Sequence, residues 1–227
     1  MALPTSVQGS GMSIPTKVPA DMTGHWQQSY AGRAPEQLSW FTPRLEHSLR
    51  HIEACGLAPG DAILDVGGGA STLVDDLLAS GHSSVTVLDL SEKALQSSRA
   101  RLGEQAAKVH WMQGDITRVD LPPAAFALWH DRALLHFLLR QEEHEAYVRR
   151  LSTALRPGGQ AVIAVFGPDG PTQCSNLPTA RYDAKQLGEL LGAQFSLEAS
   201  EFVLHATPFN TVQQFLYARF KLASDLS

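Results

Sequence analysis

Residues 63–72 have the sequence ILDVGGGAST, a short apolar run that ends in Asp65 and is followed by three glycines. The next residues, LVDDLL at 73–78, have the composition of a helix. Glycine accepts a positive φ and, lacking a Cβ, lets a ligand lie against the backbone. Ser71 or Thr72 can cap the helix, and the free N–H groups of its first turn can hold an anionic or polar group. The stretch therefore predicts a strand, a tight turn and a helix that together face a ligand.

A second acid indicates the kind of ligand. Residues 85–89, VTVLD, predict another strand that ends in Asp89, about twenty residues further on. A carboxylate there suits a ribose diol, because it can accept both hydroxyl protons. Neither phosphate-binding pattern is complete, since Thr72 stands where the dinucleotide fingerprint has its third glycine and no P-loop lysine is nearby. A nucleoside without a pyrophosphate, such as S-adenosylmethionine (SAM), fits this pattern.

The ordered set of motifs resembles the class I SAM-dependent methyltransferases. Residues 65–69 look like the family's first motif, Asp89 like the acid that ends its second strand, residues 114–116 like its adenine-side motif, and residues 155–159 like the turn before its fifth strand. The resemblance spans residues 45–166, and Ala70-Ser71 depart from it where the family often has a further Gly or Cys. It implies a Rossmann-like α/β fold, with a seven-stranded, mainly parallel sheet, helices on both faces and a C-terminal antiparallel hairpin.

Apolar periodicity predicts the elements of such a fold. Strands and helices alternate, which favours a parallel sheet: strands are expected near 61–66, 84–89, 107–112, 125–130 and 160–167, and helices near 43–56, 71–80, 91–103 and 141–155. Strand-like runs at 195–205 and 211–222 predict the hairpin. We expect a disordered segment at 1–20 and a single methyltransferase domain at 21–227, in which 21–58 form a helical N-terminal cap and 59–227 the catalytic core.

The resemblance also implies which residues bind SAM. Asp65 would organise the loop toward the methionyl end, Asp89 would bind the ribose, Asp115 the adenine amino group, and Ile116 would pack on the adenine face. Further cofactor contacts are expected just past the strand ends and in the aromatic N-terminal segment, from Tyr30, Trp40, Gly67, Gly69, Leu90 and His130. For the two aromatic residues among these, packing of a hydrophobic helix on the domain is a compatible alternative.

A polar cluster follows the fourth predicted strand, with the sequence His130-Asp131-Arg132 and then His136. If residues 133–137 are helical, Arg132 and His136 lie at i, i+4 on one face. One interpretation is a catalytic patch in which Asp131, Arg132 and His136 orient or deprotonate the acceptor, with the histidine as base. The other is a structural ion pair beside a buried histidine. Transfer from a sulfonium depends mainly on alignment and needs a base only for a protonated acceptor.

Cys174, Arg181 and His205 are candidates for substrate binding, because they follow the fifth and sixth predicted strands. Arg181 would meet an anionic substrate, or else lie on a solvated loop. No ligand spacing typical of zinc connects the cysteines and histidines, so no metal is expected.

Composition excludes several classes of partner. The 227 residues carry a net charge of −5 and no basic run longer than Arg149-Arg150, which argues against a nucleic acid. Two cysteines give no disulfide framework, so a reducing cytoplasm is the expected compartment. No apolar run approaches the length of a membrane span. We expect a cytoplasmic monomer or homodimer.

The sequence thus predicts a SAM-dependent methyltransferase that acts on a small-molecule acceptor and releases S-adenosylhomocysteine (SAH). A protein lysine methyltransferase is an alternative, because Trp26, Tyr30 and Trp40-Phe41 look like the start of enzymes that methylate elongation factors. A non-catalytic SAM-binding scaffold is a second. An NAD-dependent dehydrogenase is disfavoured by Thr72 and by the terminal hairpin.

Overall fold

The computed structural model describes residues 21–31 and 37–224. The expected disorder of residues 1–20 falls outside this part of the chain. The helices and strands are α1 (Met22–Ser29), α2 (Glu46–Glu53), β1 (Ile63–Val66), α3 (Leu73–Ala79), β2 (Val85–Asp89), α4 (Glu92–Leu102), η2 (Gly103–Lys108), β3 (Val109–Gln113), β4 (Phe126–Arg132), η3 (Leu135–Phe137), α5 (Gln141–Ala154), β5 (Leu155–Phe166), β6 (Gln173–Cys174), β7 (Leu177–Pro178), α6 (Ala184–Leu191), β8 (Phe195–Ala206) and β9 (Val212–Leu222).

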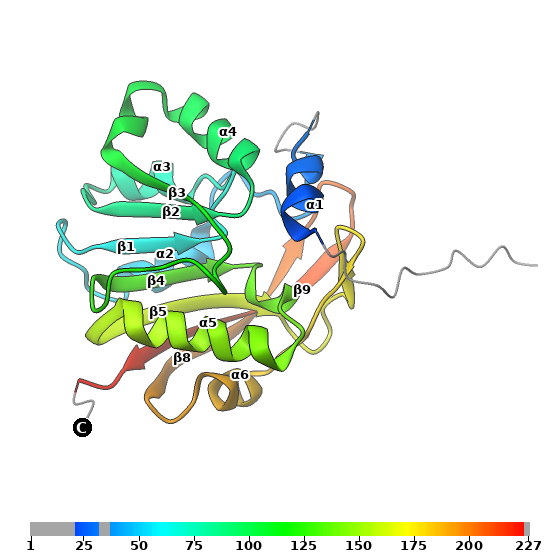
Figure 1. Ribbon diagram of the computed structural model, residues 1–227. Helices are drawn as coiled ribbons and strands as arrows, with labels where there is room; N and C mark the ends of the chain where they lie inside the picture. Colours follow the sequence, from blue (N-terminus) through cyan, green and yellow to red (C-terminus); the bar gives the residue numbers. More distant parts are fainter. Residues whose placement is uncertain (1–20, 32–36, 225–227) are drawn as a thin grey trace, which may run out of the picture.

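The central sheet has seven strands in the order β3-β2-β1-β4-β5-β9-β8. The strands from β1 to β5 are parallel, and β9 runs antiparallel between β5 and β8. This confirms the predicted Rossmann-like methyltransferase fold, including the C-terminal hairpin. Figure 1 shows helices on both faces of the sheet, with α1 standing at the edge where the parallel strands end.

Alternation along the strands explains why both faces carry helices. In β1, Ile63 packs with the apolar side chains of α2, α3 and α4 on one face, whereas Leu64 and Val66 pack with those of α5 and α6 on the other. All four residues of β1 are buried. A strand that is covered on both faces usually consists of apolar residues throughout. Asp65 is therefore an unusual charged residue in the core.

Residues 133–137 do not continue as the α-helix considered above. Ala133 has a φ of 70°, and the following turn, Leu135–Phe137, is a short 3₁₀ helix. The i, i+4 pairing of Arg132 with His136 is therefore wrong, because the chain reverses directly after β4. Two further elements, the β6–β7 hairpin and α6, have no counterpart among the predicted elements. No helix among the described residues is long and apolar enough to cross a membrane.

Candidate cofactor and acceptor site

Two adjoining cavities open where the strand order reverses between β1 and β4. In a doubly wound sheet, ligands bind at this point, outside the carboxyl ends of the strands. Residues from four separate segments line both cavities: Tyr30, Trp40, Gly67 and Arg132. The smaller cavity lies over the glycine turn, and the larger one extends past the ends of β2 and β3 beneath α1.

A buried hydrogen-bond network lies under the smaller cavity. His130 Nδ1 is 2.7 Å from Asp65 Oδ1, and His130 Nε2 is 2.9 Å from Ser48 Oγ. The three side chains are nearly inaccessible to solvent. His130 thus uses both ring nitrogens and fixes the rotamer of Asp65, which makes it a positioning residue for the carboxylate.

Two buried polar atoms of the smaller cavity's lining have no hydrogen-bond partner among the described residues: Asp65 Oδ2 and Thr72 Oγ1. An unpaired buried polar atom costs about 1–3 kcal/mol, so such atoms point to a missing ligand. A carboxylate oxygen suits an ammonium group and a hydroxyl suits a carboxylate. Together they fit the methionyl end of SAM, with Asp65 facing its amino group.

The glycine turn is shaped around two carboxylates. A Cβ on Gly68 would lie 2.3 Å from Asp65 Oδ2, and one on Gly69, whose φ is 26°, would lie 2.4 Å from Asp89 Oδ2. Gly67 has a φ of 71°. The turn therefore needs glycine both for its backbone conformation and for close approach of the acids.

Asp89 faces the larger cavity at the end of β2. The backbone N–H of Ser91 donates to its Oδ1 at 2.7 Å. Burial raises the pKa of Asp89 to about 7, and the nearby negative charge of Asp65 acts in the same direction. Burial separates this carboxylate from water, and the hydroxyls of a ribose would supply the hydrogen bonds that water no longer provides.

Leu90, Asp115 and Ile116 also line the larger cavity. Asp115 Oδ1 accepts hydrogen bonds from the backbone and the hydroxyl of Thr117, at 2.8 and 2.7 Å, which fixes the carboxylate at the turn after β3. Ile116 is 4% exposed and supplies a flat apolar surface beside it. This arrangement suits an adenine ring, because it offers one acceptor next to an apolar face.

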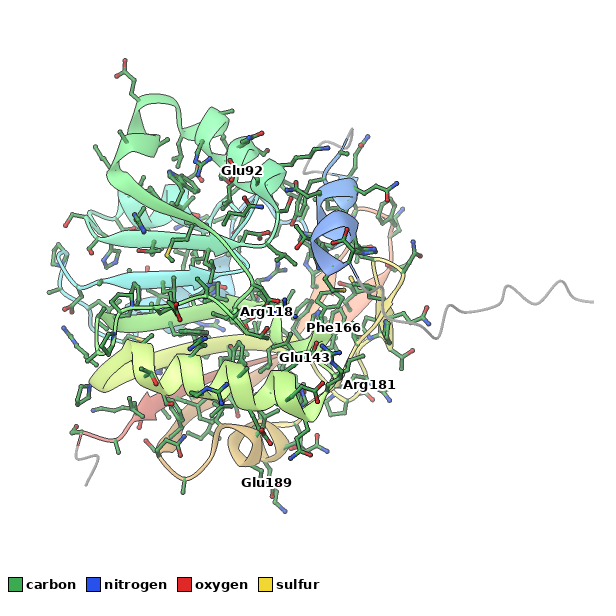
Figure 2. The ribbon with its side chains drawn as sticks, viewed as in Figure 1. Glu92, Arg118, Glu143, Phe166, Arg181 and Glu189 are labelled. Atoms are coloured by element: carbon green, nitrogen blue, oxygen red, sulfur yellow. The ribbon has the colours of Figure 1, made fainter. Side chains whose placement is uncertain are left out.

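The rest of the larger cavity is mainly aromatic. Met22, Trp26 and Tyr30 follow one another at i, i+4 and i+8 along α1 and its C-terminal end, so one face of this helix covers the cavity. Trp26 packs edge-to-face on Trp40 at 5.9 Å and on Phe137 at 5.0 Å, measured between ring centroids. Burial and the nearby Asp89 raise the pKa of Tyr30, so its phenol stays protonated. Phe166 and Phe215 complete the wall, and Figure 2 shows Phe166 on the same side of the sheet as α1.

Arg132 is the cation of this aromatic site. Its Nε donates to the hydroxyl of Tyr217 at 3.0 Å, and its Nη1 to the carbonyl of Trp40 at 2.9 Å. The guanidinium carbon lies 5.1 Å from the centroid of the Phe215 ring. Two contacts from β9 and one from the segment around Trp40 therefore hold the charge at the boundary between the two cavities.

Asp131 and His136, the other two members of the predicted catalytic patch, line neither cavity. Both are 0% exposed. Asp131 accepts hydrogen bonds from Tyr147 Oη at 2.7 Å and from the backbone of Leu134 at 3.0 Å, and burial raises its pKa to about 6. It has no ion pair with Arg132 among the described residues.

His136 is held on the other side of the turn. It stacks on Phe166 at 4.1 Å and accepts a hydrogen bond from the Phe166 backbone N–H at 3.3 Å. Burial lowers the pKa of His136 to about 3, so the ring is neutral and lies behind the aromatic wall. These contacts agree with the interpretation of His136 as a buried histidine with a structural role.

The three candidates for substrate binding are separated by the fold. Cys174 is 8% exposed and lines the larger cavity, where burial raises the pKa of its thiol. His205 lies 3.0 Å from the carbonyl of Ser39 and lines neither cavity. Arg181 is exposed and donates to the carbonyl of Pro168 at 3.0 Å. Only Cys174 is therefore in contact with the site.

Several lining residues were not among the predicted site residues. The spacing of the aromatics before residue 31 could have indicated Trp26, because it shares a helix face with Tyr30. Phe166 is indicated by its place at the end of the fifth predicted strand, whereas no local signal identifies Ser48 or Phe215, which reach the site from α2 and β9. Among the described residues, no group of three or more His, Cys, Asp or Glu side chains could hold a metal ion.

Comparison with known families agrees with this geometry. The family described as "Methyltransferase domain" matches residues 63–159, which include the glycine turn, Asp89 at the end of β2, Asp115 after β3 and the start of β5. Residues 63–159 therefore match a methyltransferase domain, and the chain has the fold of SAM-dependent methyltransferases.

Curated relatives of this methyltransferase domain act on different kinds of acceptor. The chain is 24% identical over 164 residues, or 72% of its length, to the eEF1A lysine and N-terminal methyltransferase of Mus musculus, of which it spans 22%. It is 29% identical over 138 residues, or 59% of its length, to the ubiquinone/menaquinone biosynthesis C-methyltransferase UbiE of Pseudomonas putida, of which it spans 51%. The chain thus covers about a fifth of the first protein and half of the second.

Solved structures share the fold over most of the chain. A protein described under the conversion of a disulfide bond into a thioacetal group during echinomycin biosynthesis superposes with a TM-score of 0.73 and 21% identity, over 91% of this chain and 94% of that one. The 1,6-didemethyltoxoflavin-N1-methyltransferase of Burkholderia thailandensis, with bound SAH, superposes with a TM-score of 0.65 and 22% identity, over 88% and 84%.

Proposed function

We propose that this protein transfers the methyl group of SAM to a small, largely apolar acceptor. When bound, SAM supplies a methyl group that is already activated by the positive charge on its sulfur. The chain's own residues would then bind and align the two reactants. In well-oriented reactions such alignment lowers the activation free energy by up to roughly 7–11 kcal/mol, and several kcal/mol of this could be gained here.

The roles follow from the arrangement of the lining. In this proposal Asp65 and Thr72 bind the methionyl end, Asp89 the ribose, and Asp115 with Ile116 and Leu90 the adenine. The acceptor occupies the remaining aromatic part of the larger cavity, between α1 and Phe166. Aromatic faces exclude water and attract a cationic sulfonium, so they suit both the donor and an apolar acceptor.

The aromatic cover provided by α1 is the observation that carries the choice of a small acceptor. Trp26 and Tyr30 cover part of the cavity, and Trp40 and Phe137 pack against them. A concave pocket with mainly apolar walls is typical of small-molecule sites.

A protein lysine acceptor is the second candidate, and the similarity to eEF1A lysine and N-terminal methyltransferases over 72% of this chain favours it. A non-catalytic SAM-binding protein is the remaining one. We further propose a cytoplasmic location, supported by two free cysteines, one of them buried.

Calorimetric titration of the purified protein with SAM, SAH and NAD tests the cofactor. Binding of the first two alone supports the proposal, and no binding of either contradicts it. Transfer of a radioactive methyl group from SAM then separates the acceptors: label in small organic molecules supports our proposal, label in lysine peptides supports the second candidate, and binding without any transfer supports the scaffold.

A further inference from the structure

Arg132 has no carboxylate partner in the described part of the chain. Among the described residues, no Asp or Glu oxygen lies within 4.0 Å of its guanidinium, although most other arginines of this part of the chain have such a partner. The side chain is partly buried, and its neighbours are the ring of Phe215, the backbone carbonyl of Trp40 and the hydroxyl of Tyr217. A cation in such surroundings is stabilised most strongly by binding an anion.

The guanidinium still has donors to offer. Its hydrogen bonds to Tyr217 and Trp40 use Nε and Nη1, and the group carries more N–H donors than these. Because Tyr217 and Trp40 fix the plane of the group, little side-chain freedom remains to be lost when a further partner binds. The side chain lines the larger cavity beside Phe215 and Cys174.

No described side chain at this end of the cavity is suited to remove a proton from the acceptor. Asp89 and Asp115 lie toward the end that we assign to adenosine. His136 lies behind the wall, and burial keeps the Cys174 thiol and the Tyr30 phenol protonated by raising the pKa of each. An acceptor that arrives as an anion needs no base.

We propose that Arg132 binds an anionic oxygen of the acceptor, so that the substrate is a flat, apolar molecule bearing a carboxylate, phenolate or enolate group. This inference rests on the proposed methyl transfer and names its substrate class. The acceptor loses its proton to solvent before or during binding. The nucleophilic atom of the anion then forms a bond to the methyl carbon while the S–CH₃ bond breaks, its electron pair stays on sulfur, and neutral SAH is left.

The inference is tested with two probes of equal shape, 2-naphthoate and 2-naphthamide, titrated into the SAH-saturated protein while the fluorescence of Trp26 and Trp40 is followed. We expect the wild type to bind naphthoate at least about tenfold more tightly than naphthamide, because charge-assisted hydrogen bonds are the stronger ones. Arg132→Met should abolish this preference. Arg132→Lys should keep part of it.

Arg149→Met is the matched control, since it removes the same charge from an exposed position on α5. It should leave the preference unchanged. Equal binding of the two probes by the wild type, or a preference that survives in Arg132→Met, overturns the inference. So does a large loss of SAH affinity in Arg132→Met with unchanged binding of 5′-methylthioadenosine, which would assign the arginine to the methionyl carboxylate. Failure of the wild type to bind SAH would instead contradict the proposed function.

Discussion

At the scale of single residues, the site depends on how Asp65 is held. The carboxylate is 2% exposed, and one of its oxygens is satisfied by His130 while the other has no partner among the described residues. His130→Leu removes the donor and leaves both oxygens unpaired in the core. We expect a loss of about 1–3 kcal/mol in the free energy of unfolding and a weakening of SAH binding of at least about tenfold, because Asp65 is no longer oriented.

His130→Asn provides the matched test of this positioning role. Its side-chain amide can replace the Nδ1 donor toward Asp65, although it cannot reach Ser48. Calorimetry should therefore show SAH affinity close to the wild type for His130→Asn and weakened affinity for His130→Leu. Equal affinities in the two variants would mean that the histidine only fills space.

The close approach of Gly68 to the same carboxylate leads to a second prediction. Gly68→Ala would place a methyl group 2.3 Å from Asp65 Oδ2. We expect SAH affinity to fall by at least about tenfold, since the acid must move and the cost of overpacking is about 1–3 kcal/mol. In Gly60→Ala nothing lies within 4 Å of the added Cβ, so this control should bind SAH normally. Normal binding by Gly68→Ala would contradict the prediction.

The raised pKa of Asp89, about 7, has a consequence for stability. An unfolded aspartate has a pKa of about 3.9, so between these values the folded protein holds a proton that the unfolded chain has released. This group therefore lowers the free energy of unfolding as pH rises from about 4 to 7, and its effect is constant above that range. Asp89→Asn cannot titrate. The free energy of unfolding of the variant minus that of the wild type should therefore increase across this range, by roughly 3–4 kcal/mol.

Urea unfolding of the ligand-free proteins at several pH values between about 4 and 8 measures this difference. Taking the difference removes the contributions of Asp131 and His136, which titrate in both proteins. A difference that does not change with pH would contradict the raised pKa.

At the scale of elements, α1 is attached to the core by few contacts. Gln27 Oε1 accepts hydrogen bonds from Ser91 Oγ and from the backbone N–H of Lys93, both at 3.1 Å, and so ties α1 to the start of α4. Gln27→Ala removes both bonds. We expect SAH binding to weaken by about five- to hundredfold, because each of the two hydrogen bonds contributes about 0.5–1.5 kcal/mol to holding the helix over the cavity. Gln28→Ala, on the exposed side of the same helix, should bind as the wild type does; equal losses in the two variants would mean that α1 does not close over the cofactor.

The elements also show where sequence reasoning succeeds. The glycine turn, the acids at the ends of β1 and β2 and the alternation of strands with helices are local signals, and they predicted the sheet. Arg132 and His136 show the limit. Their spacing suited a helix, but the positive φ of Ala133 ends β4 in a reversal, which sends Arg132 to the cavity and His136 behind Phe166. Such a turn, and the arrival of Phe215 from β9, are determined by packing between distant segments.

At the scale of the whole molecule, the site joins segments that lie far apart in the sequence. The smaller cavity receives residues from the N-terminal segment, β1 and β4, and the larger one adds the ends of β2, β3 and β5 and the strand β9. The buried carboxylates of Asp65 and Asp89 and the unpaired atoms of Asp65 and Thr72 lie there, which lowers stability in the absence of a ligand. The cofactor should therefore stabilise the fold as a unit.

This leads to a prediction for thermal unfolding. A ligand at about 100 times its Kd adds about 2.7 kcal/mol to the stability of the folded state. For a chain of this size, about 1 kcal/mol shifts Tm by about 2–4 °C, so SAH should raise Tm by about 5–10 °C. Differential scanning calorimetry with SAH and with an equal concentration of NAD measures both. The shift should be absent with NAD, because the turn lacks the third glycine of the dinucleotide fingerprint, and it should be strongly reduced in Gly68→Ala but not in Gly60→Ala. A similar shift with NAD would mean that the crevice recognises only the adenosine that the two ligands share, and that the unpaired atoms of Asp65 and Thr72 do not select the methionyl end.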